Sequence, residues 1–430
     1  MDSKSEQTER IFHRARKDHW PRISHGKGCY LYDTEGRSFL DACAGVHVVS
    51  IGHGVEEIAE AMADQARKVT FAYGQFISQP QIDLARKITD MAPEGMDRVF
   101  FVSGGSEATE AAMKIARKYH LESGNPSKYQ VISCWQSWHG NTIGALSMSG
   151  RSAWRKDYTP YLLDFPHISQ HSADELERVI RQVGAEYISA FIVEPVLGTS
   201  SAGMAPPDDY FSTVRELCDH YGILLIVDEV VTGYGRTGVD FGIDHWGVVP
   251  DLMATGKGLS SGYTPIAATI ARDEIYETIY ETAPAFVHGH TYGGNPLSCA
   301  TALAVQEYVE RHDLVARCAE MGEAMLERLQ SLTELPMVST VRGKGLLCGV
   351  EFTADKELDT PFDPAKGVTG RVVREAFDRG VLIMPGAPGP VDGVYGDHVA
   401  ISPPYTVNED EVARIATVLG EAVEAVERTL

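Results

Sequence analysis

Short, fully apolar runs alternate with amphipathic segments between about residues 80 and 320. The runs DRVFFVSGG, KYQVISCW, ISAFIVEPV and GILLIVDEV are predicted to be buried strands, and SEATEAAMKIARKYH and DDYFSTVRELCDHYG are predicted to be helices. Strands without a polar face that alternate with helices are typical of a parallel sheet covered on both sides. The pattern therefore predicts a large α/β domain, in which a mostly parallel sheet is covered by helices.

The two ends of the chain have a different pattern. GCYLYDTEGRSFLDACAG predicts a hairpin with its turn at EG. The C-terminal part mixes the predicted strands VSTVRGKGLLCGVEF and HVAISPP with helices around TGRVVREAFDRG and EDEVARIATVLGEAVEAVERTL. We expect a small α+β domain built from both termini, with residues 1–62 and 329–430 flanking a large domain of residues 63–328.

Composition narrows the functional class. The chain has 430 residues, of which 43% are hydrophobic and 23% charged, as in soluble globular proteins. Its N-terminal segment lacks the apolar core of a signal peptide, and its apolar runs are too short to cross a bilayer, so a cytoplasmic location is expected. A net charge of −22 argues against binding to nucleic acid or to anionic membranes. Seven cysteines without C-x-x-C spacing argue against a disulfide framework and a zinc site, so no metal is expected.

Candidate chemical groups follow several predicted strands. Asp228 lies at the end of a predicted buried strand. Burying an ionised carboxylate costs free energy unless a positively charged group pairs with it. Gly105 and Ser106 lie between a strand and a helix, whose free N–H groups can bind phosphate. Trp138 and His139 follow another strand, and the indole could stack on a flat ring. Each feature alone also has an ordinary explanation, as a loop cap, a helix cap or a packing aromatic.

The tripeptide Gly-Lys-Gly occurs three times, with its lysine at Lys27, Lys257 and Lys344. Lys27 is expected before the N-terminal hairpin and Lys344 in a strand of the small domain, whereas Lys257 follows the acid strand in the large domain. A lysine in a confined apolar site has a lowered pKa and becomes a nucleophilic amine. An amine, a buried acid, an aromatic plate and an anion site are together what pyridoxal 5′-phosphate needs.

The segment GYGRTG raises an alternative of another class, since it matches the dinucleotide fingerprint G-x-G-x-x-G. That fingerprint requires a helix directly after the glycines. The following VDFGIDHWGVVPD has no helical period, so a nicotinamide-dependent dehydrogenase is the weaker hypothesis. A non-catalytic binding protein is a third hypothesis.

Six segments, in this order, carry a family resemblance that extends over nearly the whole chain: SGGSEATEAAMKIAR, SWHG, EPV, DEVVTGYGRTG, GKGLSSGYTPIAA and HGHTYGGNPLSCA. With them the sequence resembles the class III pyridoxal-phosphate aminotransferases. This fold-type-I group includes ω-amino acid, amine–pyruvate, ornithine and 4-aminobutyrate aminotransferases.

The resemblance implies a role for each matching residue. Lys257 would form the Schiff base with the cofactor and move the proton during catalysis. Asp228 would pair with the pyridine nitrogen, while Val230 packs on one face of the ring and Trp138 on the other.

The phosphate and the surrounding loops follow in the same way. Gly105 and Ser106 would bind the phosphate, and Thr291 would reach the phosphate of the neighbouring subunit's cofactor. The resemblance therefore implies a homodimer with shared active sites, with a tetramer left open. Glu194 and His139 would have supporting roles near the cofactor, with His139 orienting Asp228.

The reaction implied is ping-pong transfer of an amino group from an amine or ω-amino acid to a 2-oxo acid, with pyruvate as the expected acceptor. A racemase or aminomutase of the same family is the alternative that keeps the cofactor.

Three positions depart from the family pattern and bear on the substrate. Val231 stands where many members have Gln, which favours amines and ω-amino acids. His47 aligns where amine–pyruvate enzymes often have a large aromatic residue, and it makes the pocket more polar. The segment VLIMPGAPGPVDGVYGDHVAISPP lacks the arginine that commonly grips the acceptor carboxylate, so Arg151 and Arg155 are the candidates for that role.

Overall fold

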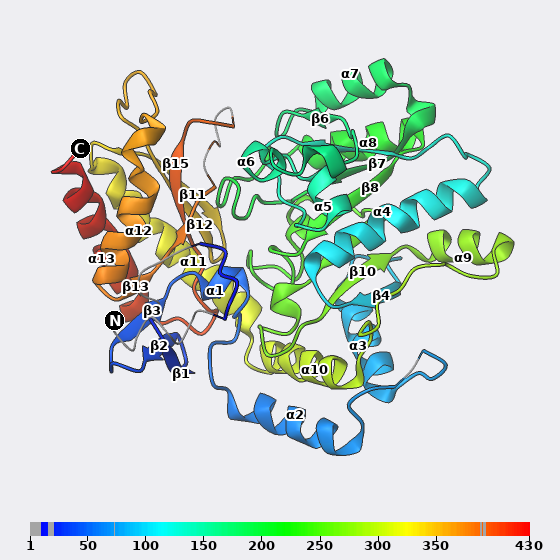
Figure 1. Ribbon diagram of the computed structural model, residues 1–430, viewed down its shortest axis with the longest axis horizontal. Helices are drawn as coiled ribbons and strands as arrows, with labels where there is room; N and C mark the ends of the chain where they lie inside the picture. The colour runs from blue at the N-terminus through cyan, green and yellow to red at the C-terminus, as the bar shows by residue number, and fades with distance from the viewer. Residues whose placement is uncertain (1–9, 16–20, 73, 388, 390–392) are drawn as a thin grey trace.

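A seven-stranded sheet forms the centre of the larger part of the molecule (Figure 1). The structure is a computed structural model that describes residues 10–15, 21–72, 74–387, 389 and 393–430. The strand order is β4 (Arg98–Val102), β10 (Ala267–Ala271), β9 (Leu252–Thr255), β8 (Leu224–Glu229), β7 (Ile188–Val193), β5 (Gln130–Cys134) and β6 (His167–Ile168). Strand β10 is antiparallel to both of its neighbours, whereas β6, β5, β7, β8 and β9 are parallel, which confirms the mostly parallel sheet.

Helices cover both faces of this sheet, because its strands are apolar on both sides. In β7, Phe191 and Val193 pack into one hydrophobic cluster, and Ala190 and Ile192 pack into the other. The first cluster includes α3 (Gln79–Met91), α7 (Ala173–Val183), α8 (Tyr210–Tyr221) and α10 (Pro296–Arg311). The second includes α4 (Gly105–Glu122), α5 (Ile143–Met148) and α9 (Asp273–Thr282). Of the remaining helices, α1 spans Ala44–His47, α2 Glu56–Lys68 and α6 Ser152–Arg155.

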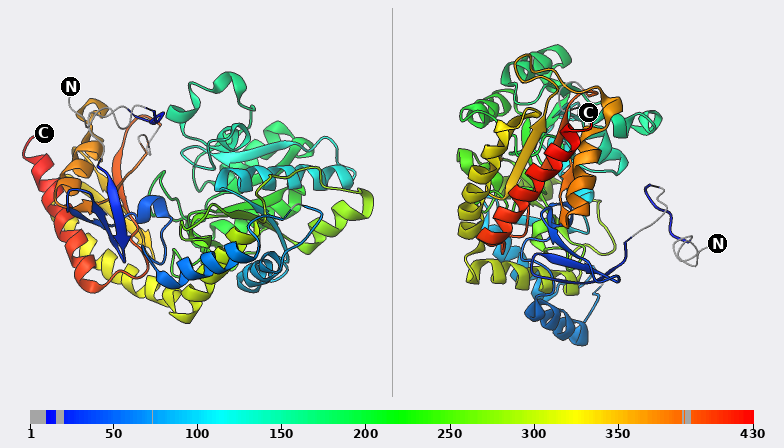
Figure 2. Two further views of the ribbon diagram at one scale, coloured as in Figure 1. Left: turned by 60° about the horizontal axis from the view of Figure 1, so that its bottom comes forward. Right: turned by 90° about the vertical axis from the view of Figure 1, so that its left-hand side faces the viewer.

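Both ends of the chain build the smaller part of the molecule. This part lies beside the larger one in all three views (Figure 1 and Figure 2). One sheet has the order β1 (Ile23–Lys27), β2 (Tyr30–Asp33), β3 (Ser38–Asp41) and β13 (Val381–Leu382). The other has the order β11 (Val338–Lys344), β12 (Leu347–Phe352), β15 (Asp397–Ile401) and β14 (Met384–Pro385). Strand β13 pairs with β3 in parallel, so a C-terminal strand extends the N-terminal sheet.

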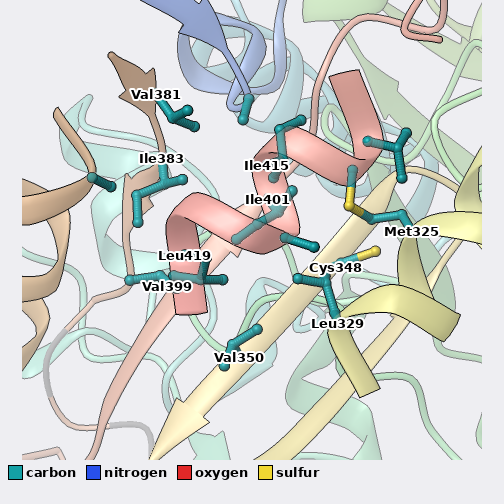
Figure 3. Packing of buried hydrophobic residues seen from close by; sticks show 14 of the residues in the cluster. Met325, Leu329, Cys348, Val350, Val381, Ile383, Val399, Ile401, Ile415 and Leu419 are labelled. Atoms are coloured by element: carbon teal, nitrogen blue, oxygen red, sulfur yellow. The ribbon is translucent and has the colours of Figure 1, made fainter. Parts of the chain in front are cut away.

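One hydrophobic core holds the smaller part together (Figure 3). It joins side chains of β12 and β15 to those of α11 (Leu314–Gln330), α12 (Val368–Asp378) and α13 (Glu409–Glu427). Leu40 and Ala42 from the N-terminal segment belong to the same core. This arrangement confirms the small α+β domain made from both termini.

The domain limits after residues 62 and 328 stay a prediction. Helix α11 crosses the second limit, and its buried side chains, from Leu314 to Leu329, pack into the core of the smaller part. We propose that the whole of α11 belongs to the smaller domain.

The predicted N-terminal hairpin consists of β2 and β3, and a further strand, β1, pairs with β2. Lys27 is the last residue of β1 and pairs with Tyr30, so it belongs to the sheet rather than to a segment before it. Gly28 allows the tight connection because it adopts a φ of 56°. Across the described ranges, no helix is long and apolar enough to cross a membrane.

Candidate active site

The predicted cofactor residues gather at one edge of the large sheet. Strand β4 runs parallel to β9 because β10 is antiparallel to both, so β4, β5, β7, β8 and β9 end at the same edge. Asp228 lies opposite Ala254 in the register of β8 and β9, and Lys257 follows three residues later. Ligands of open α/β sheets bind at this edge. The residues that follow these five strands are Gly105, Ser106, Trp138, His139, Glu194 and Lys257, with Asp228 and Val230 at the end of β8.

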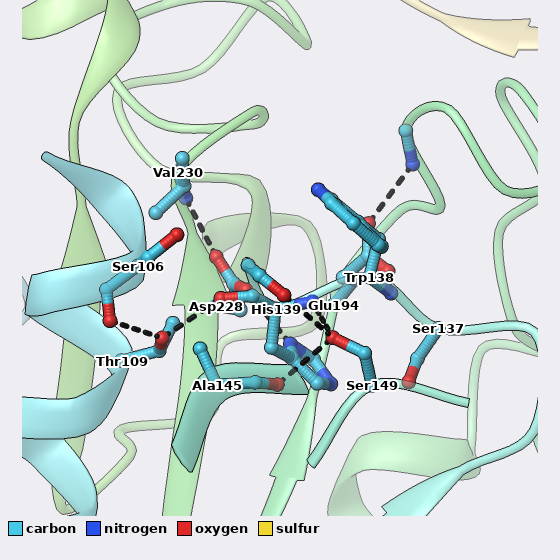
Figure 4. A network of polar contacts seen from close by, with 12 residues as sticks. Ser106, Thr109, Ser137, Trp138, His139, Ala145, Ser149, Glu194, Asp228 and Val230 are labelled. Carbon is cyan, nitrogen blue, oxygen red and sulfur yellow. Dashed lines mark hydrogen bonds and ion pairs between the residues drawn. The ribbon is translucent and has the colours of Figure 1, made fainter. Parts of the chain in front are cut away.

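Asp228 is buried and has two fixed hydrogen bonds (Figure 4). Its Oδ2 accepts a hydrogen bond from His139 Nδ1 at 2.8 Å, and its Oδ1 accepts one from the Val230 N–H at 3.0 Å. His139 is also buried, and its Nε2 has no hydrogen-bond partner among the described residues. A carboxylate only accepts, so Nδ1 carries the proton of this hydrogen bond. The imidazole therefore fixes the orientation of the carboxylate.

The loop after β5 is fixed through its backbone. The His139 N–H donates to Ser149 Oγ at 2.8 Å, and the His139 carbonyl accepts from Thr109 Oγ1 at 2.8 Å. Glu194 accepts hydrogen bonds from the backbone N–H groups of Trp138 at 2.9 Å and Gly198 at 3.1 Å. Burial raises the pKa of Glu194, with the charge of Asp228 adding to the effect. Glu194 thus holds the Trp138 backbone from the end of β7.

Lys257 begins a short 3₁₀ turn directly after β9. Its φ of 42° is in the left-handed region, which costs about 1 kcal/mol for a residue with a Cβ. The turn is held by Gln306, whose Nε2 donates to the carbonyls of Gly258 and Leu259 at 3.0 and 2.9 Å. Burial lowers the pKa of Lys257 to about 8, although the charges of Asp228 and Glu194 raise it. The amine is therefore unprotonated far more often than that of an exposed lysine.

The N-terminus of α4 forms a cup beside Lys257. Helix α4 has 18 residues and begins at Gly105, and no side chain caps its first turn. The first N–H groups of a helix lack partners within it and attract anions. A Cβ on Gly105 would lie 2.8 Å from Val230 Cγ1, so the glycine lets Val230 approach the helix start. Ser106 Oγ accepts a hydrogen bond from the Asn141 N–H at 3.1 Å, which orients the hydroxyl.

Arg151 also belongs to this group. Its guanidinium lies over the Trp138 ring at 4.6 Å from the centroid, and Trp154 packs edge-on against the same indole. Arg151 Nη2 donates to Ser200 Oγ at 2.9 Å and also to Thr199 Oγ1. Next to burial, its positive charge is one of the causes that lower the pKa of Lys257.

His47 is buried near the same charges. Its Nδ1 lies 2.6 Å from Ser402 Oγ, and its Nε2 has no partner within the described part of the chain. Burial lowers the pKa of His47 well below its usual value, and the charges of Lys257, Arg236 and Arg151 lower it further. The ring is therefore neutral at physiological pH.

Two predicted residues are placed apart from this group. Arg155 Nη1 donates to the carbonyls of Leu146, Ser147 and Ser149 at 3.1, 2.8 and 2.7 Å and lies 3.3 Å from His167 Nε2, so its described contacts are to the end of α5 and to β6. Thr291 is exposed in a turn after α9, and among the described residues no hydrogen bond joins it to Lys257 or Asp228. The structure thus brings Arg151 to the site, but not Arg155.

Arg236 is a buried residue that the sequence interpretation missed. Its Nη1 donates to the carbonyls of Leu346 at 3.1 Å and Pro403 at 2.7 Å, and its guanidinium lies over Tyr405 at 4.6 Å from the ring centroid. It joins the loop after β8 to the smaller part and places a second positive charge near Lys257. Arg236 lies in the segment GYGRTG, which the sequence analysis interpreted only through its glycines, as a possible dinucleotide-binding motif.

A buried acid, a low-pKa amine and an anion cup at the carboxyl edge of an α/β sheet define a pyridoxal-phosphate enzyme of fold type I. The chain matches the sequence pattern of the family described as "Aminotransferase class-III" over residues 12–423. This chain belongs to the class III aminotransferases, which depend on pyridoxal phosphate.

Individual relatives agree with this family. The chain is 35% identical to the putrescine–pyruvate aminotransferase of Pseudomonas aeruginosa, over 92% of this chain and 88% of the relative. It is 35% identical to the diaminobutyrate–2-oxoglutarate transaminase of Halomonas elongata, over 94% and 90%. The solved ω-transaminase of Pseudomonas jessenii in complex with PMP superposes with a TM-score of 0.93 at 30% identity, over 100% of this chain and 99% of that one.

The residues at the sheet edge fit the cofactor. Asp228 is a fixed, buried acceptor suited to a ring N–H, and Lys257 is an amine with a lowered pKa. The start of α4 offers N–H groups to a phosphate, and the glycine at 105 lets Val230 pack directly beside it. The nicotinamide hypothesis is wrong, because the chain is a transaminase and only a short 3₁₀ turn, Gly242–Trp246, follows the GYGRTG segment. Among the described residues, no group of three or more His, Cys, Asp or Glu side chains could hold a metal ion.

The lowered pKa of Lys257 gives a direct prediction for the cofactor-free protein. Acylation of Lys257 is expected to be half-maximal near pH 8, because burial lowers its pKa to about 8. Asp228→Asn is expected to move the midpoint to lower pH, since the Asp228 charge raises this pKa. Mass spectrometry of the labelled peptides measures both effects, with the Lys27 peptide as an internal reference. A midpoint equal to that of the same peptide in the unfolded protein would contradict the assignment.

Proposed function

We propose that this protein transfers an amino group from an amine or ω-amino acid to pyruvate by a ping-pong mechanism. The donor leaves as a carbonyl compound before the acceptor binds, and the acceptor leaves as an amino acid. The observation that carries the proposal is the position of the low-pKa Lys257 amine at the sheet edge that also holds the Asp228–His139 pair.

Lys257 and Asp228 would have the two central roles. Pyridoxal phosphate, when bound, supplies an aldehyde that condenses with amines and a ring that accepts electrons from the substrate carbon. The Lys257 amine would hold the cofactor and then move a proton at the substrate carbon as general base and acid. Asp228 would accept the N–H of the ring nitrogen and keep that nitrogen protonated. His139 is a positioning residue, since its Nδ1–H fixes the carboxylate that does this.

The surrounding residues would hold the ring and the phosphate. We assign Val230 and Trp138 to the two faces of the ring, and Glu194 to fixing the backbone of Trp138. Gly105 and Ser106 would bind the phosphate at the start of α4, where the helix dipole favours negative charge.

Thr291 would complete the phosphate site of a partner subunit in a homodimer. It lines a surface hollow together with Phe71, Phe76 and Ile77. Phe76 and Ile77 are 71% and 69% exposed, and Tyr292 next to Thr291 is 65% exposed. Large exposed apolar side chains that cluster on one surface mark interaction sites. A second copy of the chain bound to this surface would cover these apolar side chains. The tetramer and the cytoplasmic location remain predictions from the sequence.

Arg151 is the residue that we assign to the acceptor carboxylate. The relatives named above use pyruvate in one case and 2-oxoglutarate in the other. Pyruvate has one carboxylate. Arg151 Nη1 makes no hydrogen bond to the described residues, so it would be available to bind that carboxylate. Arg155 would instead hold the end of α5, since its Nη1 already donates to three carbonyls. His47 and Val231 would line the neutral part of the substrate pocket.

The two half-reactions can be followed separately. With an ω-amino acid alone, the yellow holoenzyme is expected to lose its colour and release one carbonyl product per site. Pyruvate should then restore the colour and yield one alanine per site. Lys257→Ala is expected to lower both rates at least about 100-fold, because general acid–base catalysis contributes that much. Lys344→Ala, in the same tripeptide, should leave both rates unchanged.

The same measurement separates the racemase and aminomutase alternative from transfer. Internal amino migration or loss of chirality without a released carbonyl product would exclude the proposed transfer. Absorbance and chromatography of the carbonyl product are the readouts.

The role of Thr291 can be tested by mixing two variants, each of which is impaired on its own. Thr291→Ala is expected to weaken cofactor binding about 10- to 100-fold, since a hydrogen bond to a charged group contributes about 1.5–3 kcal/mol. A mixed dimer of Lys257→Ala and Thr291→Ala subunits has one site with both residues intact. At limiting cofactor its activity should exceed that of either variant alone. Equal activity of the mixture and the separate variants would show that Thr291 does not act across subunits.

A further inference from the structure

The loop after β8 joins the two parts of the molecule through Arg236. Its guanidinium is buried, and Nη1 donates to the carbonyls of Leu346 at 3.1 Å and Pro403 at 2.7 Å. These carbonyls belong to two segments of the smaller part, the turn between β11 and β12 and the segment after β15. The guanidinium also lies over the ring of Tyr405, with its Cζ 4.6 Å from the ring centroid. Arg236 therefore fixes the loop and both segments relative to one another.

Two buried tyrosines extend this connection to the strand that precedes Lys257. Tyr405 Oη donates to the Tyr234 carbonyl at 3.0 Å, and Tyr234 Oη donates to Thr255 Oγ1 at 2.9 Å. Thr255 is the last residue of β9, and its own hydroxyl donates to the Ala268 carbonyl of β10 at 3.1 Å. Burial raises the pKa of both phenols, so they stay protonated and act as donors. The hydrogen bonds thus run from the smaller part of the molecule to the end of β9.

The same tyrosines pack against the turn that begins with Lys257. A Cβ on Gly258 would lie 3.4 Å from Tyr234 Cβ and 3.8 Å from Tyr405 Oη, so both side chains lie directly beside this backbone. Gln306 of α10 donates to the Gly258 carbonyl at 3.0 Å. The lysine itself has a left-handed φ of 42°, a conformation that persists only where the surrounding structure holds it. The two tyrosines therefore belong to the contacts that hold the lysine in this conformation.

Arg236 is also a buried cation without an acid partner. Among the described residues no ion pair joins it to a carboxylate, and its Nε and Nη2 have no hydrogen-bond partner. Burying an unpaired charge costs free energy, and proteins keep such exceptions mainly at functional sites. After burial, the charge of Arg236 is one of the causes that lower the pKa of Lys257 and of His47. Arg236 thus acts on the lysine amine as well as on the backbone around it.

We propose that Arg236 is a positioning residue for Lys257, which acts through Tyr405 and Tyr234 to fix the lysine turn against the smaller part of the molecule. This inference rests on the proposed role of Lys257 and adds the residues that support it. The amine must reach the substrate carbon from one defined position, because a slightly misplaced reacting group loses much of its rate advantage. The guanidinium and the two hydroxyls would hold that position without touching the reacting atoms.

Removal of single hydroxyl groups tests the positioning. Tyr405→Phe and Tyr234→Phe each keep a ring and lose one donor, so both variants are expected to fold and to form the yellow holoenzyme. Each is expected to lower kcat about 10- to 100-fold while KM for the donor changes less than about 3-fold, since the hydroxyls position the lysine and do not bind substrate. Because both act in one network, the double variant should lose about as much as the stronger single variant. A wild-type kcat in both single variants would overturn the proposal.

The cofactor-free protein gives a readout that does not depend on turnover. In Arg236→Gln the midpoint for acylation of Lys257 is expected to move to higher pH, because the lost positive charge no longer lowers its pKa. Arg317→Gln is the matched control, since Arg317 Nη2 donates to the Val407 carbonyl of the same C-terminal segment at 2.7 Å. This control should keep the wild-type midpoint. An unchanged midpoint in folded Arg236→Gln would contradict the assignment, and the tyrosine variants decide the question if Arg236→Gln does not fold.

The results separate this inference from the proposed function. If Lys257→Ala retains both half-reactions, the proposed role of the lysine fails. If Lys257→Ala is inactive while both tyrosine variants and Arg236→Gln match the wild type, only the positioning role fails.

Discussion

The hydrogen bond between His139 and Asp228 is the interaction on which the site depends. Both groups are buried, and each fixes the orientation of the other. The network around the pair reaches the start of α4 through Thr109 and the end of α5 through Ser149. The orientation of one carboxylate is therefore tied to the packing of helices α4 and α5.

The charges around Lys257 explain how an amine can be reactive in this position. Burial and the positive charges of Arg151 and Arg236 lower its pKa, whereas Asp228 and Glu194 raise it, with a result of about 8. Removing either kind of charge would move the amine away from the pH at which it can both accept and donate a proton. Arg151 thus contributes to the reactivity of the amine through its charge.

Much of this architecture was predictable from the sequence because each part has a local signal. Strands apolar on both faces predicted the covered parallel sheet, and the strand ends predicted where Asp228, Trp138 and His139 lie. The third strand of the N-terminal sheet was missed because β1, with the sequence ISHGK, is short, polar and exposed. Arg236 was missed because its burial depends on Leu346, Pro403 and Tyr405, which are more than 100 residues away in the chain. The choice between Arg151 and Arg155 depends on contacts that have no local signal. Arg151 reaches Thr199 and Ser200, which are 48 and 49 residues away in the chain, whereas Arg155 turns back to carbonyls 6 to 9 residues before it.

The three Gly-Lys-Gly lysines give the most direct test of the account. In the structure Lys27 ends β1, Lys344 ends β11 and Lys257 alone follows a strand beside Asp228. The holoenzyme can be reduced with borohydride, which makes the bond between cofactor and lysine permanent, and then digested and mapped by mass spectrometry. The account predicts the cofactor mass on the Lys257 peptide and on neither of the other two. The cofactor on Lys27 or Lys344, or on no lysine peptide of a yellow holoenzyme, would contradict it.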